Sequence, residues 1–162
     1  MMLKKSLIAL SLLTLPLTAS ANWSAGAGYA NFSDNGISLD AAYASMSYLF
    51  PKQDGKFVVI SELRYAAGIS DDTVGGLEIK LDNFTAFSMR GQYNYDNGMY
   101  LYAAPSLAQL SLNVKNAASI TSWDLGLGAG VGKKLTDQAS VEASYENYDG
   151  TDVFSVGFKY AF

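Results

Sequence analysis

Apolar and polar residues alternate along most of the chain after residue 21. Between residues 77 and 95 the odd positions, such as Leu77, Ile79 and Phe87, are largely apolar, while the even positions carry most of the charge. The same alternation recurs in 122–134, 139–148 and 152–162. Successive side chains of a strand point to opposite faces, so this pattern predicts strands with one apolar and one polar face.

Short turn signals divide this part of the chain into eight predicted strands. Asn35-Gly36 and Asn97-Gly98 are the clearest, because both residues readily take the positive φ angles of a tight hairpin turn. The expected strands are 23–32, 37–50, 56–67, 76–95, 99–112, 120–134, 139–148 and 152–162. Every connection is short, which predicts antiparallel hairpins within a single domain.

Aromatic residues gather at both ends of the predicted strands. One end carries Trp23, Tyr48, Phe50, Phe57, Tyr93, Tyr95, Tyr100, Tyr102, Tyr160 and Phe162. The opposite end carries Tyr29, Phe32, Tyr65, Trp123, Tyr145, Tyr148 and Phe154. Two aromatic belts around an apolar band are typical of a barrel in lipid, whereas a soluble sandwich or barrel needs no belts at two heights. The predicted fold is all-β, an eight-stranded antiparallel up-and-down transmembrane β-barrel with both termini on one side.

The first 21 residues have the features of a signal peptide. Lys4 and Lys5 precede a short apolar run at 7–15, and Ala19-Ser20-Ala21 has the small-residue form of a cleavage site. The apolar run is too short for a membrane-spanning helix, which needs about 20 residues. We therefore expect cleavage after Ala21, which leaves residues 22–162 as the barrel.

The C-terminal strand resembles a known assembly signal. Phe162 follows Tyr160 and Phe158 at alternate positions, as in bacterial outer-membrane barrels. Together with the signal peptide and the eight segments, residues 22–162 are similar to small barrels of the OmpA membrane-domain, OmpX and opacity-protein group. The resemblance implies a monomer in the bacterial outer membrane, in contact with its lipids and lipopolysaccharide. It also implies recognition of the C-terminal strand by the barrel assembly machinery. The adhesins of this group have long outer loops, whereas the outer connections here are a few residues each.

Composition excludes several functions. The chain has no His and no Cys, which removes the Ser-His-Asp triad, thiolate sites and most transition-metal sites. A net charge of −4 gives no reason to expect nucleic-acid binding. Alternate glycines from Gly126 to Gly132 do not match a nucleotide-binding loop and lie within a predicted strand, where they would make room for long side chains. Glu142 and Glu146 could form a catalytic pair, but a sugar could not enter a filled barrel. We therefore predict no enzymatic activity and no cofactor.

The charged face of the strands is expected to line the barrel interior. Eight strands leave a lumen just wide enough for side chains to fill, so charges there must be paired. The predicted polar network of the lumen is Glu62, Arg64, Glu78, Lys80, Asp82, Arg90, Asp124, Glu142, Glu146 and Lys159.

The positions of the charges predict strand registers in which opposite charges face each other. One register places Glu62 opposite Lys80 and Arg64 opposite Glu78, and a turn at Gly150-Thr151 places Glu142 opposite Lys159. The same turn places Val141 opposite Tyr160 and Ala143 opposite Phe158. An Asn97-Gly98 turn would pair Tyr95 with Tyr100 and Tyr93 with Tyr102.

Two functions fit this interior best. A closed, salt-bridged lumen predicts a structural or interaction protein of the envelope. The acidic excess among the expected lumen residues predicts, as the alternative, a narrow cation-preferring channel. A barrel that holds an apolar molecule is a third, less favoured function.

Overall fold

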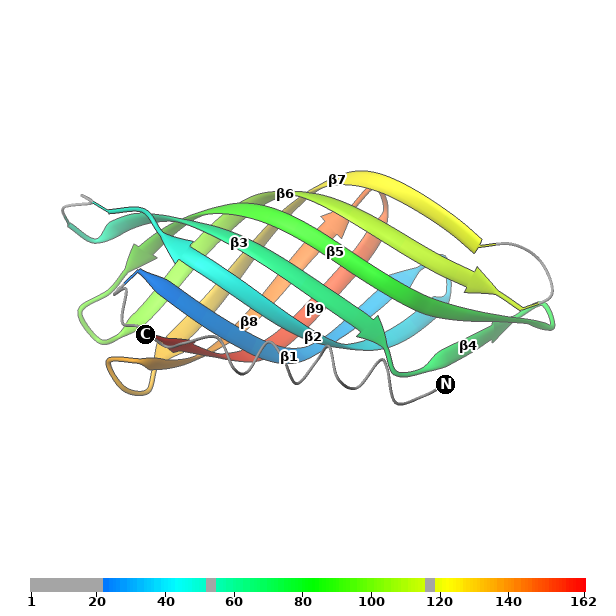
Figure 1. The fold of residues 1–162 in the computed structure, drawn as a ribbon, viewed down its shortest axis with the longest axis horizontal. Helices are drawn as coiled ribbons and strands as arrows, with labels where there is room; N and C mark the ends of the chain where they lie inside the picture. Colours follow the sequence, from blue (N-terminus) through cyan, green and yellow to red (C-terminus); the bar gives the residue numbers. More distant parts are fainter. Residues whose placement is uncertain (1–21, 52–54, 116–118) are drawn as a thin grey trace.

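The chain forms a closed antiparallel β-barrel (Figure 1). This computed structural model describes residues 22–51, 55–115 and 119–162. The strands are β1 (Trp23–Asp34), β2 (Ile37–Leu49), β3 (Phe57–Gly68), β4 (Asp71–Val74), β5 (Leu77–Asn94), β6 (Met99–Val114), β7 (Ser119–Lys134), β8 (Ala139–Tyr148) and β9 (Thr151–Ala161). Strands β3 and β4 are successive parts of one barrel strand, because both pair with β5. The β3–β5 pairing closes the sheet, and the predicted eight-stranded barrel is confirmed.

Both ends of the described chain lie at the same end of the barrel. The Phe162 amide donates to the Trp23 carbonyl at 3.0 Å, and we call this the terminal end. The beginning of β3 and the turns before β6 and before β8 lie there as well, at the left of Figure 1. The predicted signal peptide, 1–21, lies outside the described residues. No helix in the described part of the chain is long and apolar enough to cross a membrane.

The β8–β9 hairpin turns one residue earlier than predicted. Asp149 and Gly150 take the two positive φ angles, 47° and 99°, and Tyr148 pairs with Thr151. Val141 therefore lies opposite Phe158, and Glu142 lies opposite Gly157, so the predicted register is wrong by two residues. A shift of two leaves every side chain on its predicted face.

The β5–β6 hairpin differs from its prediction by one residue, which has larger consequences. The Tyr95 amide donates to the Met99 carbonyl, which encloses a three-residue loop with Gly98 at φ 78°. A register shift of one residue moves every side chain of a strand to the opposite face. Tyr100 and Tyr102 therefore point into the barrel, and Tyr93 packs outside against Tyr95, with ring centroids 5.1 Å apart.

The register predicted for the third and fourth strands is also wrong. Glu62 pairs with Ser88 and Arg64 with Ala86, because the chain turns at Gly75-Gly76 after the short β4. A bulge between Leu81 and Asn83 interrupts the alternation of β5. Before the bulge it is the odd positions, not the even ones, that face inward, and Leu81 is 3% exposed.

Strands β5, β6 and β7 extend beyond the rest of the barrel. They contain 18, 16 and 16 residues, against 10 and 11 in β8 and β9. Within the described chain, residues 119–125 of β7 pair with β6 only. Together with β4, the free ends of these strands form a sheet beyond the barrel at the right of Figure 1, which we call the outer projection.

The outside of the barrel is largely apolar, with aromatic side chains towards both ends. Trp23 and Tyr160 lie near the terminal end, and Tyr65 and Trp123 lie towards the other. Four residues predicted for these belts point inward instead, namely Phe32, Tyr100, Tyr102 and Tyr148. The prediction failed for these four because aromatic character by itself does not indicate which face of a strand a residue occupies.

Candidate functional site: the barrel interior

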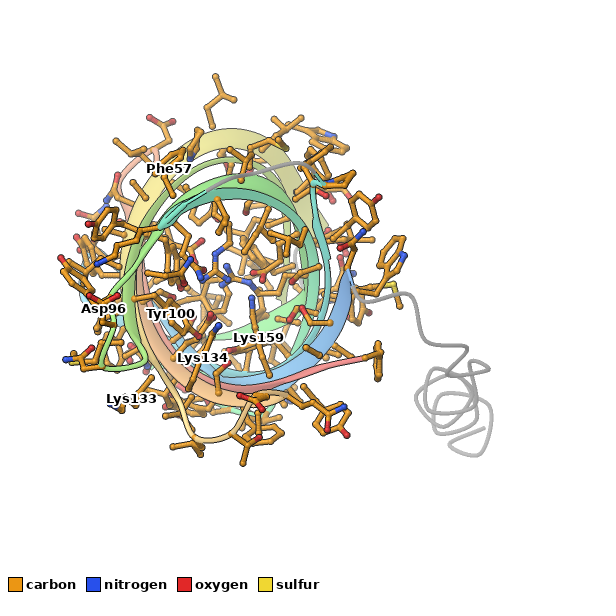
Figure 2. All side chains as sticks on the ribbon, turned by 90° about the vertical axis from the view of Figure 1, so that its left-hand side faces the viewer. Phe57, Asp96, Tyr100, Lys133, Lys134 and Lys159 are labelled. Carbon is orange, nitrogen blue, oxygen red and sulfur yellow. The ribbon has the colours of Figure 1, made fainter. Side chains whose placement is uncertain are left out.

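Six charged side chains from β3, β5, β8 and β9 meet in the interior, among them Lys159, which Figure 2 labels inside the barrel. This charged layer consists of Glu62, Arg64, Arg90, Glu142, Glu146 and Lys159. Each of these side chains is at most 12% exposed. Three carboxylates face three cations, so the layer is electrically balanced and meets the requirement that buried charges be paired.

Arg90 joins two of the carboxylates. One guanidinium nitrogen lies 2.7 Å from Glu142, and another lies 3.3 Å from Glu62. The guanidinium carbon also lies 3.5 Å from the centre of the Tyr102 ring, in cation–π geometry. Arg90 is therefore held by charge on one side and by an aromatic face on the other.

The remaining cations complete the layer. Arg64 pairs with Glu146 at 2.5 Å and lies 3.7 Å from Glu62. Lys159 binds Glu62 and lies 3.4 Å from Glu142. Lys159 and Glu142 are thus in contact, as predicted, although they are not directly opposite each other. Every charged group of the layer has a partner of opposite charge.

Tyrosines extend the layer, and glycines make room for them. The Tyr100 hydroxyl donates to Glu142 at 2.8 Å, and the Tyr148 hydroxyl donates to Glu146. A Cβ at Gly132 would overlap the Tyr100 ring, and one at Gly130 would overlap Tyr102. The alternate glycines of β7 therefore leave space for long side chains from neighbouring strands, as predicted.

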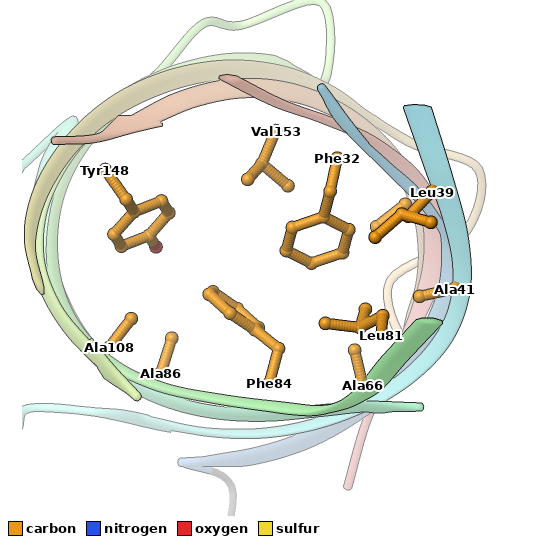
Figure 3. Packing of buried hydrophobic residues seen from close by; sticks show 11 residues of the cluster. Phe32, Leu39, Ala41, Ala66, Leu81, Phe84, Ala86, Ala108, Tyr148 and Val153 are labelled. Atoms are coloured by element: carbon orange, nitrogen blue, oxygen red, sulfur yellow. The ribbon is translucent and has the colours of Figure 1, made fainter. Parts of the chain in front are cut away.

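An apolar layer fills the other half of the interior (Figure 3). It consists of Phe32, Leu39, Leu81, Phe84, Tyr148 and Val153, with the alanines at 30, 41, 66, 86 and 108 between them. The Phe84 ring packs edge-on against Phe32 and Tyr148, at centroid distances of 5.0 and 5.4 Å. Phe84 is 1% exposed and is thus packed on all sides within this layer.

The structure brings together six of the ten residues predicted for the lumen network. The prediction is wrong for Glu78, Lys80 and Asp82. These residues lie on the outer projection and face away from the barrel interior, because the β5 bulge moves their side chains to the opposite face of the strand. Asp124 is half-buried near the far end of β7, where Ser122 donates to it at 2.7 Å.

The charges on the outer projection pair with one another. Glu78 lies 2.6 Å from Lys115 and 3.0 Å from Lys80, and Lys80 also lies 3.3 Å from Asp71. Hydrogen bonds from Lys115 and then Lys80 lower the pKa of Glu78 to about 2. Charged side chains on the outer face of strands are costly inside a bilayer, so this part of β5 lies beyond it.

The apolar layer and the inward tyrosines were not predicted from the sequence. Their signal is present but indirect. Glycines at 28, 130 and 132 predict large inward partners, and these partners are Tyr43, Tyr102 and Tyr100. Only the register of the neighbouring strands tells which side chain fills the space above each glycine.

Comparison with known proteins agrees with this geometry. The model of the outer membrane protein beta-barrel domain matches residues 6–162, so the chain belongs to this family. No curated protein matches the chain.

Several solved structures share the fold at low sequence identity. The chain is similar to Ail, the attachment invasion locus protein of Yersinia pestis, at 16% identity and a TM-score of 0.58, covering 89% of this chain and 100% of that one. It is similar to the N-terminal β-barrel domain of Pseudomonas aeruginosa OprF at 18% identity and a TM-score of 0.58, covering 87% of this chain and 98% of that one. It is similar to Neisserial surface protein A at 17% identity and a TM-score of 0.54, covering 86% of this chain and 96% of that one. These structures share the barrel fold, and membership of the outer membrane protein family implies that this chain lies in the bacterial outer membrane.

A location in the outer membrane raises the question of which end of the barrel faces the periplasm. We expect an exported chain with an even number of strands to have both termini on the periplasmic side, and in that predicted orientation the terminal end faces the periplasm. The charged layer then lies in the periplasmic half of the barrel, and the apolar layer and the outer projection lie towards the outside.

Proposed function

We propose that the protein is a closed structural barrel of the outer membrane that makes contacts through its outer end. One observation carries this proposal: the interior is filled by side chains in both halves, with paired charges on the periplasmic side and packed rings on the outer side. An ion that crossed the barrel would have to displace Phe84 and its neighbours, in which the Tyr148 hydroxyl, already bonded to Glu146, is the one polar side-chain group to replace its hydration shell.

Conductance in a planar bilayer tests the closed interior. We expect the refolded barrel to be silent after insertion has been shown by heat-modifiable migration on a gel. Discrete steps that change with Glu62→Gln, but not with the matched exterior variant Lys80→Gln, would establish the narrow cation-preferring channel instead. Such a result would overturn the proposal.

The outer projection supports the interaction part of the proposal. Residues 119–125 of β7 present an edge that no described strand covers, and Ile120 and Trp123 on it are 56% and 65% exposed. A free strand edge can bind an extended polypeptide segment by adding it to the sheet. We infer that a partner protein binds here as an added strand.

A polyanionic ligand does not fit the same surface. Ail has been solved in complex with the heparin analogue sucrose octasulfate. On this chain Lys80 and Lys115, the lysines described on the outer projection, are both paired with carboxylates. Three more carboxylates are exposed or half-buried at this end of the barrel, namely Asp34 at the end of β1, Asp72 on β4 and Asp149 in the β8–β9 turn. An extended peptide that brings its own basic residues suits this charge better.

Proline substitution tests strand addition. Thr121→Pro and Ser122→Pro each remove one backbone donor from β7, and neighbouring residues of a strand direct their donors to opposite sides. One of the two variants should therefore abolish capture of a partner while the barrel stays folded. Crosslinking from a photoreactive residue at position 120 should report that capture. Unchanged crosslinking in both variants would refute binding at this edge.

A further inference from the structure

An apolar groove crosses the lipid-facing wall in the periplasmic half of the barrel. Its floor is formed by Gly91, Ala103 and Ala129, which are direct cross-strand neighbours on β5, β6 and β7. Its volume is about 350 Å³. Three small residues in one row leave a depression between the larger side chains that flank them.

Large apolar side chains border this depression. The Phe57 ring lies over Gly91, where an added Cβ would come within 3.0 Å of it. Tyr93 and Leu101 line the groove on its periplasmic side and are 42% and 46% exposed. This face lies against the hydrocarbon of the bilayer, so whatever occupies the groove must itself be apolar.

A lysine lies on the same face at the edge of the membrane. Lys133 follows Ala129 by four residues on β7, which places its Cα about 13 Å farther along the tilted strand, in the direction of the terminal end. Figure 2 shows it on the outside of the barrel wall. Its ammonium group donates to the Asn97 carbonyl, and no carboxylate among the described residues lies within ion-pair distance of it. The Lys133 charge is thus available to an anion at the interface.

We propose that this groove holds one acyl chain of an anionic glycerophospholipid of the periplasmic leaflet, with the phosphate of the lipid at Lys133. An apolar groove below an unpaired cation, at the spacing between a headgroup and the middle of its chain, is complementary to such a lipid. A second copy of the barrel suits the groove less well. A two-fold axis along the membrane normal would bring the two Lys133 side chains together, and like charges repel across an interface.

Native mass spectrometry of the refolded barrel tests the proposal. The barrel is titrated with dioleoyl phosphatidylglycerol, and separately with dioleoyl phosphatidylcholine. We expect one phosphatidylglycerol to be retained, with at least tenfold preference over phosphatidylcholine. Ala129→Phe fills the groove and should weaken retention of both lipids at least tenfold. Ala27→Phe, at an exposed position of β1 outside the groove, is the matched control and should change nothing.

The headgroup contact is tested separately. Lys133→Gln should remove the preference for phosphatidylglycerol and leave retention of phosphatidylcholine unchanged, whereas the neighbouring Lys134→Gln should keep the preference. Uptake of many lipids without saturation, or equal retention by Ala129→Phe and Ala27→Phe, would show an ordinary lipid shell and overturn the proposal. A dimer that Ala129→Phe dissociates would identify a second copy as the occupant, which also overturns it.

Discussion

Removal of Arg90 is the sharpest perturbation of the charged layer. Its guanidinium is 2% exposed and contacts Glu142 at 2.7 Å and Glu62 at 3.3 Å. Arg90→Met keeps most of the side-chain volume but leaves three buried carboxylates facing two cations. Breaking a buried ion pair by removing one partner costs about 3–5 kcal/mol, and we expect a loss of that size in the free energy of unfolding.

Removal of Glu142 as well should recover part of this loss. In Arg90→Met/Glu142→Leu, Arg64 still binds Glu146 and Lys159 still binds Glu62, so charge balance is restored. Tyr100 loses its carboxylate partner but keeps Ser140 at 3.1 Å. The double variant should therefore be more stable than the sum of the two single losses by about 1–3 kcal/mol.

Urea unfolding of the barrel in phospholipid vesicles, followed by tryptophan fluorescence, measures these energies. The matched control is the ion pair of half-buried Glu78 and exposed Lys80, tested as Glu78→Leu and Lys80→Met, whose coupling should stay below about 1 kcal/mol. A loss below about 1 kcal/mol for Arg90→Met, with coupling below about 0.5 kcal/mol, would show that water screens the interior. That result would refute a layer of buried charges that depend on one another for their stability.

Three further predictions concern other parts of the barrel. Phe84→Ala should lower the free energy of unfolding by about 3–5 kcal/mol in the same urea assay, whereas Phe87→Ala on the lipid-facing side of β5 should cost clearly less; equal losses would argue against a packed apolar layer. Gly132→Ala should destabilise the barrel by about 1–3 kcal/mol through its overlap with the Tyr100 ring, and Tyr100→Ser should suppress the defect; a Gly132→Ala barrel of unchanged stability would contradict this close approach. The carboxyl of Glu78 should titrate near pH 2 by carbon NMR. Because its pKa is lower in the folded protein, its contribution to stability is present above the ordinary pKa near 4.5 and is lost as the pH falls towards 2. A titration midpoint near 4.5 would show that the lysine contacts do not form.

The sequence by itself determined the architecture, because alternation and turn residues are local properties. Each strand needs only its own residues to show two faces, and Asn35-Gly36 specifies a tight hairpin whatever surrounds it. The same local signals predicted the inward glycines of β7 and six members of the charged layer. They did so because a two-residue error in register, as in the β8–β9 hairpin, leaves faces unchanged.

Tertiary structure decided which side chains meet. A bulge adds one residue to one strand, and only the neighbouring strand reveals it, so Glu78 and Lys80 could not be placed from the pattern of β5. The three-residue loop after Tyr95 likewise turned Tyr100 inward, where it meets Glu142. Contacts across the lumen, such as Arg64 with Glu146, join residues far apart in the chain and depend on the closure and stagger of the whole sheet. Local periodicity carries no information about these quantities, so the layered interior emerges only when the barrel is closed.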